Sequence, residues 1–261
     1  MLRVLNRGLA GKRGLVGACR LQSSVSYKKE GDVGIITMDD GKMNSFSFSH
    51  MDGLSAALDQ AADDGAVVLT GNAKCFSAGF DLKVMMGEDK DEAARMIAQG
   101  GEFVRRIFSF PRPVVAAATG HALAAGAIVL LASDVRIAGS NAKAKFGLNE
   151  VAIGLAMPVY GMELARARLD PRHLSRALCQ AAVVGAEEAQ AIGYLDEVVE
   201  AQDPDAVVEH AVSRAQQLAE TLQSPAFALT KMKERQMYVD AIEQTWDAEM
   251  AFYADRNNWP S

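Results

Sequence analysis

The chain has 261 residues, of which 49% are hydrophobic, so it can bury one sizeable core and form one α/β domain of ordinary length. Its formal net charge of −6 argues against a nucleic-acid partner. No apolar run reaches the roughly 18 residues of a membrane span. The three cysteines, Cys19, Cys75 and Cys179, show no CxxC spacing, which indicates reduced thiols in a non-secreted protein.

Residues 1–29 differ from the rest of the chain because they carry several Arg and Lys but no Asp or Glu. Leucines near the start share one helical face, and arginines lie on the other. An Arg-rich, acid-free amphipathic start is typical of a mitochondrial transit peptide, so residues 1–22 are predicted to direct the protein to the mitochondrial matrix. The alternatives are an N-terminal extension that frays, or the N-terminal end of a bacterial reading frame.

From Val25 onward the chain has the patterning of a folded α/β core. The second strand is apolar on both faces and is therefore expected inside a sheet. The predicted elements in this half are strands at 25–30 and 32–38 joined at Gly31, a helix from Ser47 or Ser49 to about 62, a strand at 66–70, a loop at 83–91, a helix from about 92 to 108, and a strand at 113–118.

The remainder of the chain is mostly helical. Lys231 and Lys233 are expected to be solvated helix lysines, with contact to a phosphate as the alternative. The predicted elements are a strand at 134–138, a helix starting at 158, helices at 172–180 and 187–193, a strand at 194–199, and three closing helices at about 204–222, 225–238 and 240–255.

The strand at 113–118 leads into a turn of small residues, Gly120–Ala127, and then into the apolar helical run 128–132. The backbone N–H groups of such a turn have no helical partner, and Gly and Ala let another molecule approach them closely. The helix N-terminus adds a partial positive charge, which favours a negatively charged oxygen. The alternative is a helix packed tightly on a sheet, which uses small residues for the same geometric reason.

A second turn, Cys75–Leu82, follows the strand at 66–70, and Asp81 stands in it where an N-cap begins a helix. Two strand–turn–helix junctions that face one another can place two backbone N–H donors on one oxygen, which is an oxyanion hole. Glu150, farther along the chain, is then a candidate base. A helix-start or surface glutamate is the alternative for that residue.

Three stretches carry a resemblance to a known family: Phe76–Leu82, Gly120–Gly126 and Phe146–Glu150. In their order, their spacing and their strand–turn–helix context they resemble the crotonase (enoyl-CoA hydratase/isomerase) superfamily. Each motif alone is weak, whereas the three together are specific. The likeness runs from about Val25 to the C-terminal helices.

The resemblance implies an α/β fold, the crotonase (ClpP-like) fold of repeated ββα units, with a core domain at 23–199 and a C-terminal α-helical trimerisation region at 200–261. It implies a homotrimer or a dimer of trimers. It also implies an acyl-CoA thioester as substrate, with coenzyme A as part of that substrate and no further cofactor. No sequence cluster of His, Cys and carboxylates supports a metal site.

Residue by residue, the resemblance makes the backbone amides of Phe80 and Ala125 the oxyanion hole and Glu150 the catalytic carboxylate. Bond-making at the α-carbon places negative charge on the thioester oxygen, and two preorganised donors stabilise this enolate more than the neutral ground state. The resemblance further implies substrate contacts at Ala78, Asp81, Leu82, Gly126 and Ile128.

Ile128 is the sharpest departure from the family. Family hydratases place two glutamates around the substrate; the second matches Glu150, and the first falls at Ile128, which can neither bind water nor move a proton. One carboxylate suffices to take a proton from the α-carbon of a 3-enoyl-CoA and return it to the γ-carbon. We therefore predict a Δ3,Δ2-enoyl-CoA isomerase of mitochondrial fatty-acid β-oxidation, and Gly147–Glu150 also resembles the matching segment of mitochondrial enoyl-CoA isomerases.

Two alternatives stay open: hydration of a 2-enoyl-CoA by Glu150 with another group, and a catalytically silent family member that serves in binding or assembly. Glu163 is a candidate for the missing carboxylate, but Arg166 follows at helical i+3 spacing, so a surface ion pair is expected. Ser77 lacks a paired base, and His121 is expected to act sterically. Apolar neighbours predict a raised pKa for the Glu150 carboxyl.

Overall fold

The structure, a computed structural model, describes residues 24–141, 143–201 and 203–259. Its centre is a six-stranded sheet in the order β1-β2-β3-β5-β7-β9, in which β1 and β2 form an antiparallel hairpin and the other neighbours are parallel. The hairpin reverses at Gly31, whose φ of 61° favours glycine. The strands are β1 (Val25–Glu30), β2 (Val33–Met38), β3 (Ala66–Thr70), β5 (Val114–Ala118), β7 (Val135–Gly139) and β9 (Glu197–Val199).

A second, three-stranded parallel sheet carries both of the turns that the sequence singles out. Its order is β4-β6-β8, with β4 at Cys75–Ser77, β6 at His121–Leu123 and β8 at Phe146–Gly147. The prediction of one continuous turn at 120–127 is wrong because Ala122 and Leu123 pair with β8. Strand β6 therefore occupies the first half of that stretch, and a helix starts directly behind it.

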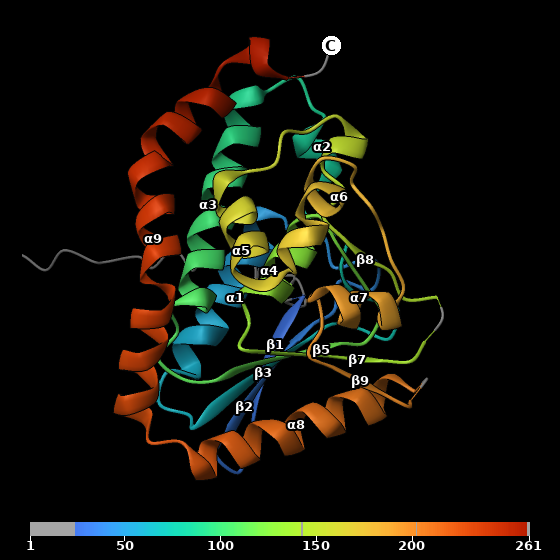
Figure 1. The fold of residues 1–261 in the computed structure, drawn as a ribbon, viewed down its shortest axis with the longest axis vertical. Coiled ribbons are helices and arrows are strands. Elements are labelled where there is room, and N and C mark those ends of the chain that lie inside the picture. Colours follow the sequence, from blue (N-terminus) through green and yellow to red (C-terminus); the bar gives the residue numbers. More distant parts are fainter. Residues whose placement is uncertain (1–23, 142, 202, 260–261) are drawn as a thin grey trace, which may run out of the picture.

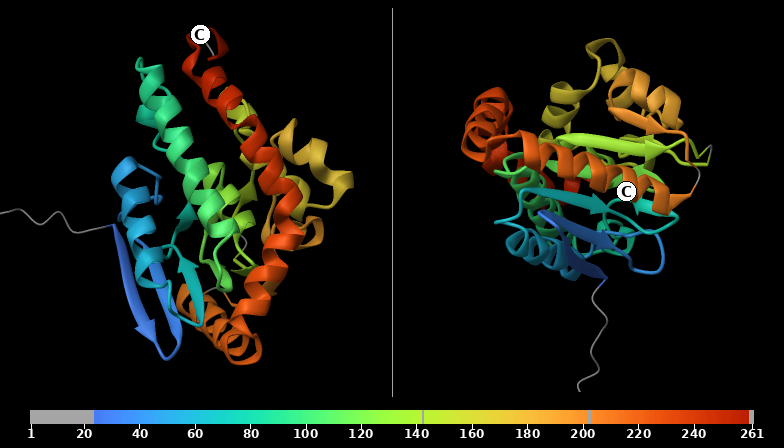
Figure 2. Two further views of the ribbon diagram at one scale, coloured as in Figure 1. Left: turned by 90° about the vertical axis from the view of Figure 1, so that its left-hand side faces the viewer. Right: turned by 90° about the horizontal axis from the view of Figure 1, so that it is seen from below.

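Helices cover both faces of the large sheet. Figure 1 shows α8 below the sheet and α1, α3 and α4 above it, and Figure 2 shows α8 crossing the strands from beneath. The helices are α1 (Phe48–Gln60), α2 (Leu82–Met85), α3 (Lys90–Phe108), α4 (Ala125–Ala132), α5 (Val159–Arg168), α6 (Leu174–Leu178), α7 (Ala186–Ile192), α8 (Pro204–Thr221) and α9 (Ser224–Ala254), with 3₁₀ turns at Val151–Ile153, Pro171–His173 and Arg256–Asn258.

The central strands divide their side chains between two cores. In β3, Val67 and Leu69 face the main core, whereas Ala66 and Val68 face the smaller core between the sheet and α8. Alternation of this kind follows from the two-residue period of a strand, and both faces are apolar because helices cover both. The prediction that β2 lies inside a sheet is confirmed, since it pairs with β1 on one side and β3 on the other.

The C-terminal region differs from the sequence-based expectation. Three helices were expected after residue 204, but α8 is followed by one continuous helix of 31 residues, α9, along α3 (Figure 1). No Gly or Pro interrupts the sequence near residue 239, and Val239 and Ile242 are buried in the main core. Packing therefore favours continuation where a break was predicted.

Lys231 of α9 is buried, so the expectation of a solvated lysine is wrong. Its ammonium donates to Asp134 Oδ2 at 2.7 Å, and the guanidinium of Arg235 donates to Asp134 Oδ1 at 2.7 Å. The same carboxylate accepts the amide of Val114 at 2.8 Å. Burial lowers the pKa of Lys231 to about 8. The carboxylate of Asp134, which is 11% exposed, thus fixes α9 to the start of β5.

Asp134→Asn is expected to lower the free energy of unfolding by about 3–5 kcal/mol, because it leaves Lys231 buried without its carboxylate and leaves Arg235 with only the exposed carboxylate of Glu234. Chemical denaturation measures the loss. Asp63→Asn is the matched control, since Asp63 is exposed, and its effect is expected within about 0.5 kcal/mol. Equal stabilities of the two variants would contradict the assignment of this ion cluster.

Among the described residues, no helix combines the length and apolar character that a membrane span requires. The predicted transit peptide, residues 1–22, lies outside the described residues.

Candidate active site

The two turns predicted to face one another are in direct contact. Gly79, with a φ of 93°, stands so close to α4 that a Cβ there would lie 3.0 Å from both the Ala124 Cβ and the Ala125 amide nitrogen. A Cβ on Gly126 would lie 2.2 Å from the carbonyl oxygen of Ser77. Glycine at both positions therefore allows the end of β4 and the start of α4 to touch through their backbones.

Two amides at this contact have no acceptor within the described residues. Gly79 donates to the Ser77 hydroxyl at 3.1 Å, and Asp81 donates to the Phe46 carbonyl at 3.2 Å. The intervening amide of Phe80 has no such partner, nor has the amide of Ala125 at the first position of α4. The α4 N-terminus adds a partial positive charge beside these donors, so the site favours an oxygen with negative charge.

Backbone strain lies at the same place. Ala124, the N-cap of α4, has φ 48° and ψ −129°, a conformation that only glycine adopts easily. A non-glycine residue held there costs about 1–3 kcal/mol, and such strain gathers at functional sites. The carbonyl of Ala124 accepts the amides of Ala127 and Ile128, which starts the helix.

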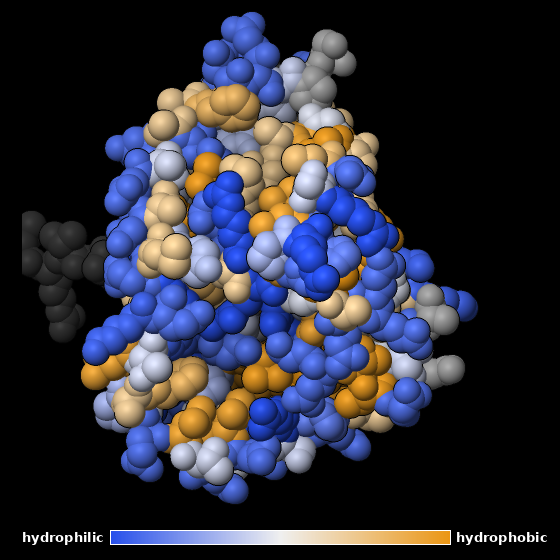
Figure 3. Space-filling view, viewed as in Figure 1, coloured by the Kyte–Doolittle hydropathy of each residue, from blue (hydrophilic) through white to orange (hydrophobic). Residues whose placement is uncertain are grey.

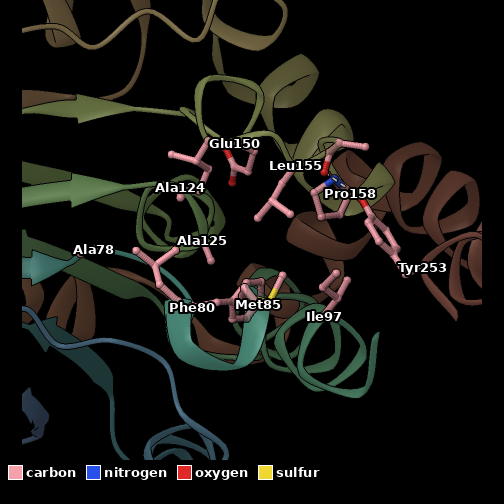
Figure 4. A pocket seen from close by; sticks show the side chains of 13 residues that line it. Ala78, Phe80, Met85, Ile97, Ala124, Ala125, Glu150, Leu155, Pro158 and Tyr253 are labelled. Carbon is pink, nitrogen blue, oxygen red and sulfur yellow. Dashed lines mark hydrogen bonds between the residues drawn. The ribbon is translucent and has the colours of Figure 1, made fainter. Parts of the chain in front are cut away.

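A pocket lies beside these donors, and Figure 4 shows Glu150 and Ala125 near one end and Tyr253 near the other. Tyr253 donates its hydroxyl to the carbonyl of Ala156 at 2.9 Å. Except for Glu150 and Tyr253, the lining side chains are apolar, so the pocket suits a hydrocarbon. The lining residues are Ala78, Phe80, Leu82, Met85, Ile97, Ala124, Ala125, Glu150, Ile153, Leu155, Ala156, Pro158 and Tyr253.

Apolar side chains also gather on the surface near this pocket. Figure 3 shows apolar residues around α2 and the neighbouring end of α3. Leu82 and Met86 of α2 are 56% and 55% exposed. Since Leu82 also lines the pocket, the apolar character of its interior continues to the surface.

The structure brings together five of the eight residues that the sequence predicts for the site: Ala78, Phe80, Leu82, Ala125 and Glu150. The other three, Asp81, Gly126 and Ile128, do not line the pocket.

The three residues outside the pocket have structural contacts of their own. Asp81 caps α2 by accepting the amide of Lys83 at 2.9 Å. Gly126 packs on the carbonyl of Ser77, and Ile128 is fully buried against Gly161 of α5. Ile128 occupies the interior side of α4, where its side chain fills space between two helices.

Glu150 is buried, with 6% of its surface exposed, and its Oε2 has no hydrogen-bond partner among the described residues. It follows β8, and its carbonyl accepts the amides of Ile153 and Leu155 at 3.0 and 2.9 Å, which fixes the chain as it turns. Burial raises the pKa of the Glu150 carboxyl to about 8, as its apolar neighbours predict. A surface glutamate is thereby excluded, and the carboxyl is suited to accept a proton near neutral pH.

The raised pKa of Glu150 makes stability depend on pH. The folded protein holds this proton up to about pH 8, whereas the unfolded chain releases it near 4.5. The stabilising contribution is therefore full below 4.5 and is lost as the pH rises through about 8. Glu150→Gln cannot ionise, so its Tm is expected to equal that of the wild type near pH 4.5 and to exceed it above pH 8. Equal Tm values at both pH extremes would contradict this expectation.

Other candidate groups do not join the site. Glu163 pairs with Arg166 as predicted; the guanidinium of Arg166 is exposed at the surface, whereas Glu163 is buried, with 8% of its surface exposed. It does not line the pocket. The Ser77 hydroxyl donates to the carbonyl of Asn44 at 2.8 Å, and no basic side chain is among its hydrogen-bond partners in the described part of the chain. The described residues contain no group of three or more His, Cys, Asp or Glu with the geometry of a metal site.

Sequence reasoning missed the far end of the pocket. Tyr253 and Pro158 carry no local motif there, and Tyr253 contacts Ala156 across 97 residues of sequence. Such a contact has no sequence signal at short range. Met85, a flexible apolar side chain, also lines the pocket and is 2% exposed.

Comparison with known proteins agrees with this arrangement. The enoyl-CoA hydratase/isomerase family model matches residues 28–258. A probable enoyl-CoA hydratase of Mycobacterium tuberculosis is 36% identical over 174 residues, which cover 66% of this chain and 62% of that relative. The chain thus spans less than two thirds of the length of this curated relative.

Solved structures match over more of the chain. An apo enoyl-CoA isomerase from Mycobacterium tuberculosis is 36% identical, covers 89% of this chain and 98% of its own, and has a TM-score of 0.81. A second structure of that protein is described as a probable enoyl-CoA hydratase. The human mitochondrial Δ3-Δ2-enoyl-CoA isomerase is 26% identical, with coverages of 88% and 90% and a TM-score of 0.82. The predicted crotonase fold is thereby confirmed. The chain belongs to the enoyl-CoA hydratase/isomerase family of the crotonase superfamily.

Proposed function

We propose that the protein is a Δ3,Δ2-enoyl-CoA isomerase of fatty-acid β-oxidation, with an acyl-CoA thioester as substrate and no cofactor besides the coenzyme A of that substrate. One observation carries the proposal: of the 13 residues that line the pocket, Glu150 is the one with a carboxylate. The likeness to the human mitochondrial isomerase supports it.

In the proposed reaction, the thioester oxygen accepts hydrogen bonds from the amides of Phe80 and Ala125. Neither amide has an acceptor in the part of the chain that the structure describes, and both residues line the pocket. When the α-carbon loses its proton, the electron pair of the broken C–H bond moves onto this oxygen as an enolate. The amides and the α4 N-terminus stabilise this charge, and one such donor contributes about 3–4 kcal/mol.

Glu150 accepts the α-proton and then donates it to the γ-carbon. The electrons of the enolate re-form the carbonyl, the double bond moves from the β,γ to the α,β position, and the carboxylate is restored. Atoms and charge balance without water. Because the carboxyl is buried and its pKa lies near 8, it can both take and return a proton near neutral pH.

Hydration of a 2-enoyl-CoA is the second candidate, because a similar protein is described as a probable hydratase. That reaction needs a second group beside Glu150, either to activate the water or to protonate the substrate. The position of the missing family glutamate, Ile128, is buried and apolar. An apolar residue at this position favours isomerisation, because that reaction needs only one carboxylate and proceeds without water.

The test is to incubate the purified protein separately with a 3-enoyl-CoA and a 2-enoyl-CoA and to follow absorbance and product mass. We expect the 3-enoyl-CoA to become conjugated at unchanged mass. Gain of one water by the 2-enoyl-CoA at a faster rate would assign the protein as a hydratase. If the protein neither converts nor binds either of the two thioesters, the catalytically silent alternative is favoured.

Tyr253 is expected to limit acyl chain length, because it stands at the far end of the pocket (Figure 4). Tyr253→Ala opens that end, and each added methylene that becomes buried contributes about 0.8 kcal/mol, or about fourfold in kcat/KM. Measurement of kcat/KM over a series of chain lengths checks the shift toward longer chains. Tyr253→Phe keeps the ring, so its chain-length preference is expected to match the wild type; an unchanged preference in Tyr253→Ala would refute this role.

We also propose that residues 1–22 direct the protein to the mitochondrial matrix and that it assembles as a homotrimer or a dimer of trimers. The Arg-rich, acid-free start supports the first proposal. Import into isolated mitochondria, with loss of mass at the N-terminus, tests it. Light scattering of the purified protein tests the second, and a monomer at micromolar concentration would reject it.

A further inference from the structure

The turn that carries Phe80 is held by a separate loop, residues 40–46, between β2 and α1. The carbonyl of Met43 accepts the amide of Ala78 at 3.0 Å. Phe46 donates its amide to Gly79 at 2.8 Å and accepts the amide of Asp81 at 3.2 Å. The backbone is therefore held on both sides of Phe80, and the Phe80 amide has no acceptor among residues 24–141, 143–201 and 203–259.

Asn44 lies at the centre of this loop with a fully buried side chain. Its amide group donates to three carbonyls, those of Met38 at 3.0 Å, Cys75 at 2.9 Å and Phe76 at 3.2 Å. Its Oδ1 accepts the backbone amide of Asp40 at 3.0 Å. One side chain thus ties the end of β2 to β4, the strand that leads into the turn.

The backbone of Asn44 continues the same network toward the site. Its carbonyl accepts the Ser77 hydroxyl at 2.8 Å, and the oxygen of that hydroxyl accepts the amide of Gly79 at 3.1 Å. Asn44 has a φ of 50°, a left-handed conformation that asparagine tolerates better than most residues. Asn44, the Ser77 hydroxyl and the Gly79 amide therefore form a continuous chain that ends one residue before Phe80.

We propose that Asn44 is a positioning residue for the oxyanion hole, acting through Ser77 to aim the Phe80 amide into the pocket. The inference rests on the function proposed above. Asn44 does not line the pocket, so it acts through the backbone. A hydrogen-bond donor aimed in advance needs no reorganisation when charge develops, and preorganisation of this kind is the main source of its effect.

Ser77→Ala is the first test, because it removes the link to Gly79 and leaves the three carbonyls held by Asn44 satisfied. Asn44→Gly is the second, because glycine accepts a positive φ and only the side chain is lost. Thr70→Val is the matched control: Thr70 is also buried, and its hydroxyl donates to the carbonyl of Ala117 at 3.1 Å in the large sheet. Thr70→Val therefore deletes a buried hydroxyl-to-carbonyl hydrogen bond in the large sheet and not in the turn that carries Phe80.

The readout is the infrared carbonyl stretch of a bound saturated acyl-CoA labelled with ¹³C at the thioester carbonyl, together with kcat and KM for a 3-enoyl-CoA. The wild type and Thr70→Val are expected to shift the stretch to lower frequency on binding. Ser77→Ala and Asn44→Gly are expected to lose at least about half of that shift and about tenfold in kcat, with KM changed less than about threefold.

An unchanged carbonyl shift in folded Ser77→Ala would overturn the positioning role, whatever its kcat. If Asn44→Gly does not fold, the Ser77→Ala result decides alone. A wild-type protein that binds the thioester without any carbonyl shift would instead reject the oxyanion hole itself, so the failure of this inference and the failure of the proposed function remain distinguishable.

Discussion

Glu150→Gln is expected to lose isomerisation of a 3-enoyl-CoA by a factor of about 10² to 10⁴, the range for removal of a general acid–base group. The amide has the shape of the carboxyl but cannot accept the α-proton. Steady-state kinetics measures the loss. Binding of a saturated acyl-CoA is expected to stay within a few-fold of the wild type, because the oxyanion donors and the apolar pocket are unchanged.

Glu163→Gln is the control for Glu150→Gln. Glu163 is also a buried carboxylate, but it lies outside the pocket, paired with Arg166. Its activity per folded molecule is expected to match the wild type. Undiminished isomerisation by Glu150→Gln would reject the proposed mechanism, and equal losses in both variants would show a general loss of structure.

Gly126→Ala is expected to lower kcat by about 10² or more, which is the effect of losing one oxyanion donor. The added Cβ would lie 2.2 Å from the backbone carbonyl of Ser77, so the end of β4 and the start of α4 must move apart. The amides of Phe80 and Ala125 belong to these two segments, and their spacing changes with them. Overpacking of this kind also destabilises the fold by about 1–3 kcal/mol.

Gly185→Ala is the matched control for that prediction. Gly185 has φ −83°, and a Cβ there would meet no atom within 4 Å. Its kcat and Tm are expected to stay near wild-type values. A folded Gly126→Ala protein with full kcat would show that the close contact of the two turns is not needed for activity.

The small-residue turns at Gly79 and Gly126 and the site carboxylate Glu150 could be predicted from sequence because their signals are local, whereas the short strands β4 and β6 that lead into the turns could not. Gly79 followed by Asp81, and Gly126 followed by an apolar run, each indicate a turn and the start of a helix within a few residues. The apolar residues next to Glu150 in the sequence likewise predict the raised pKa of its carboxyl. These features need no knowledge of which distant segments meet.

The features that the sequence could not predict depend on contacts between distant segments. Lys231 resembles any helix lysine until Asp134, 97 residues away, is seen beside it. Tyr253 reaches the pocket from the last turn of α9, and Asn44 reaches β4 across more than 30 residues. The predicted break near residue 239 failed for the same reason, because burial against the core holds α9 continuous there.

The pH dependence of kcat/KM for a 3-enoyl-CoA is the sharpest test of a lone carboxylate acting as base. We expect kcat/KM to rise tenfold per pH unit below about 8 and then to level off, since it reports the ionisation of Glu150 in the free enzyme. A bell-shaped profile would mean that a second ionising group takes part, and a flat profile would mean that Glu150 is not the base. Either result would contradict the proposed mechanism.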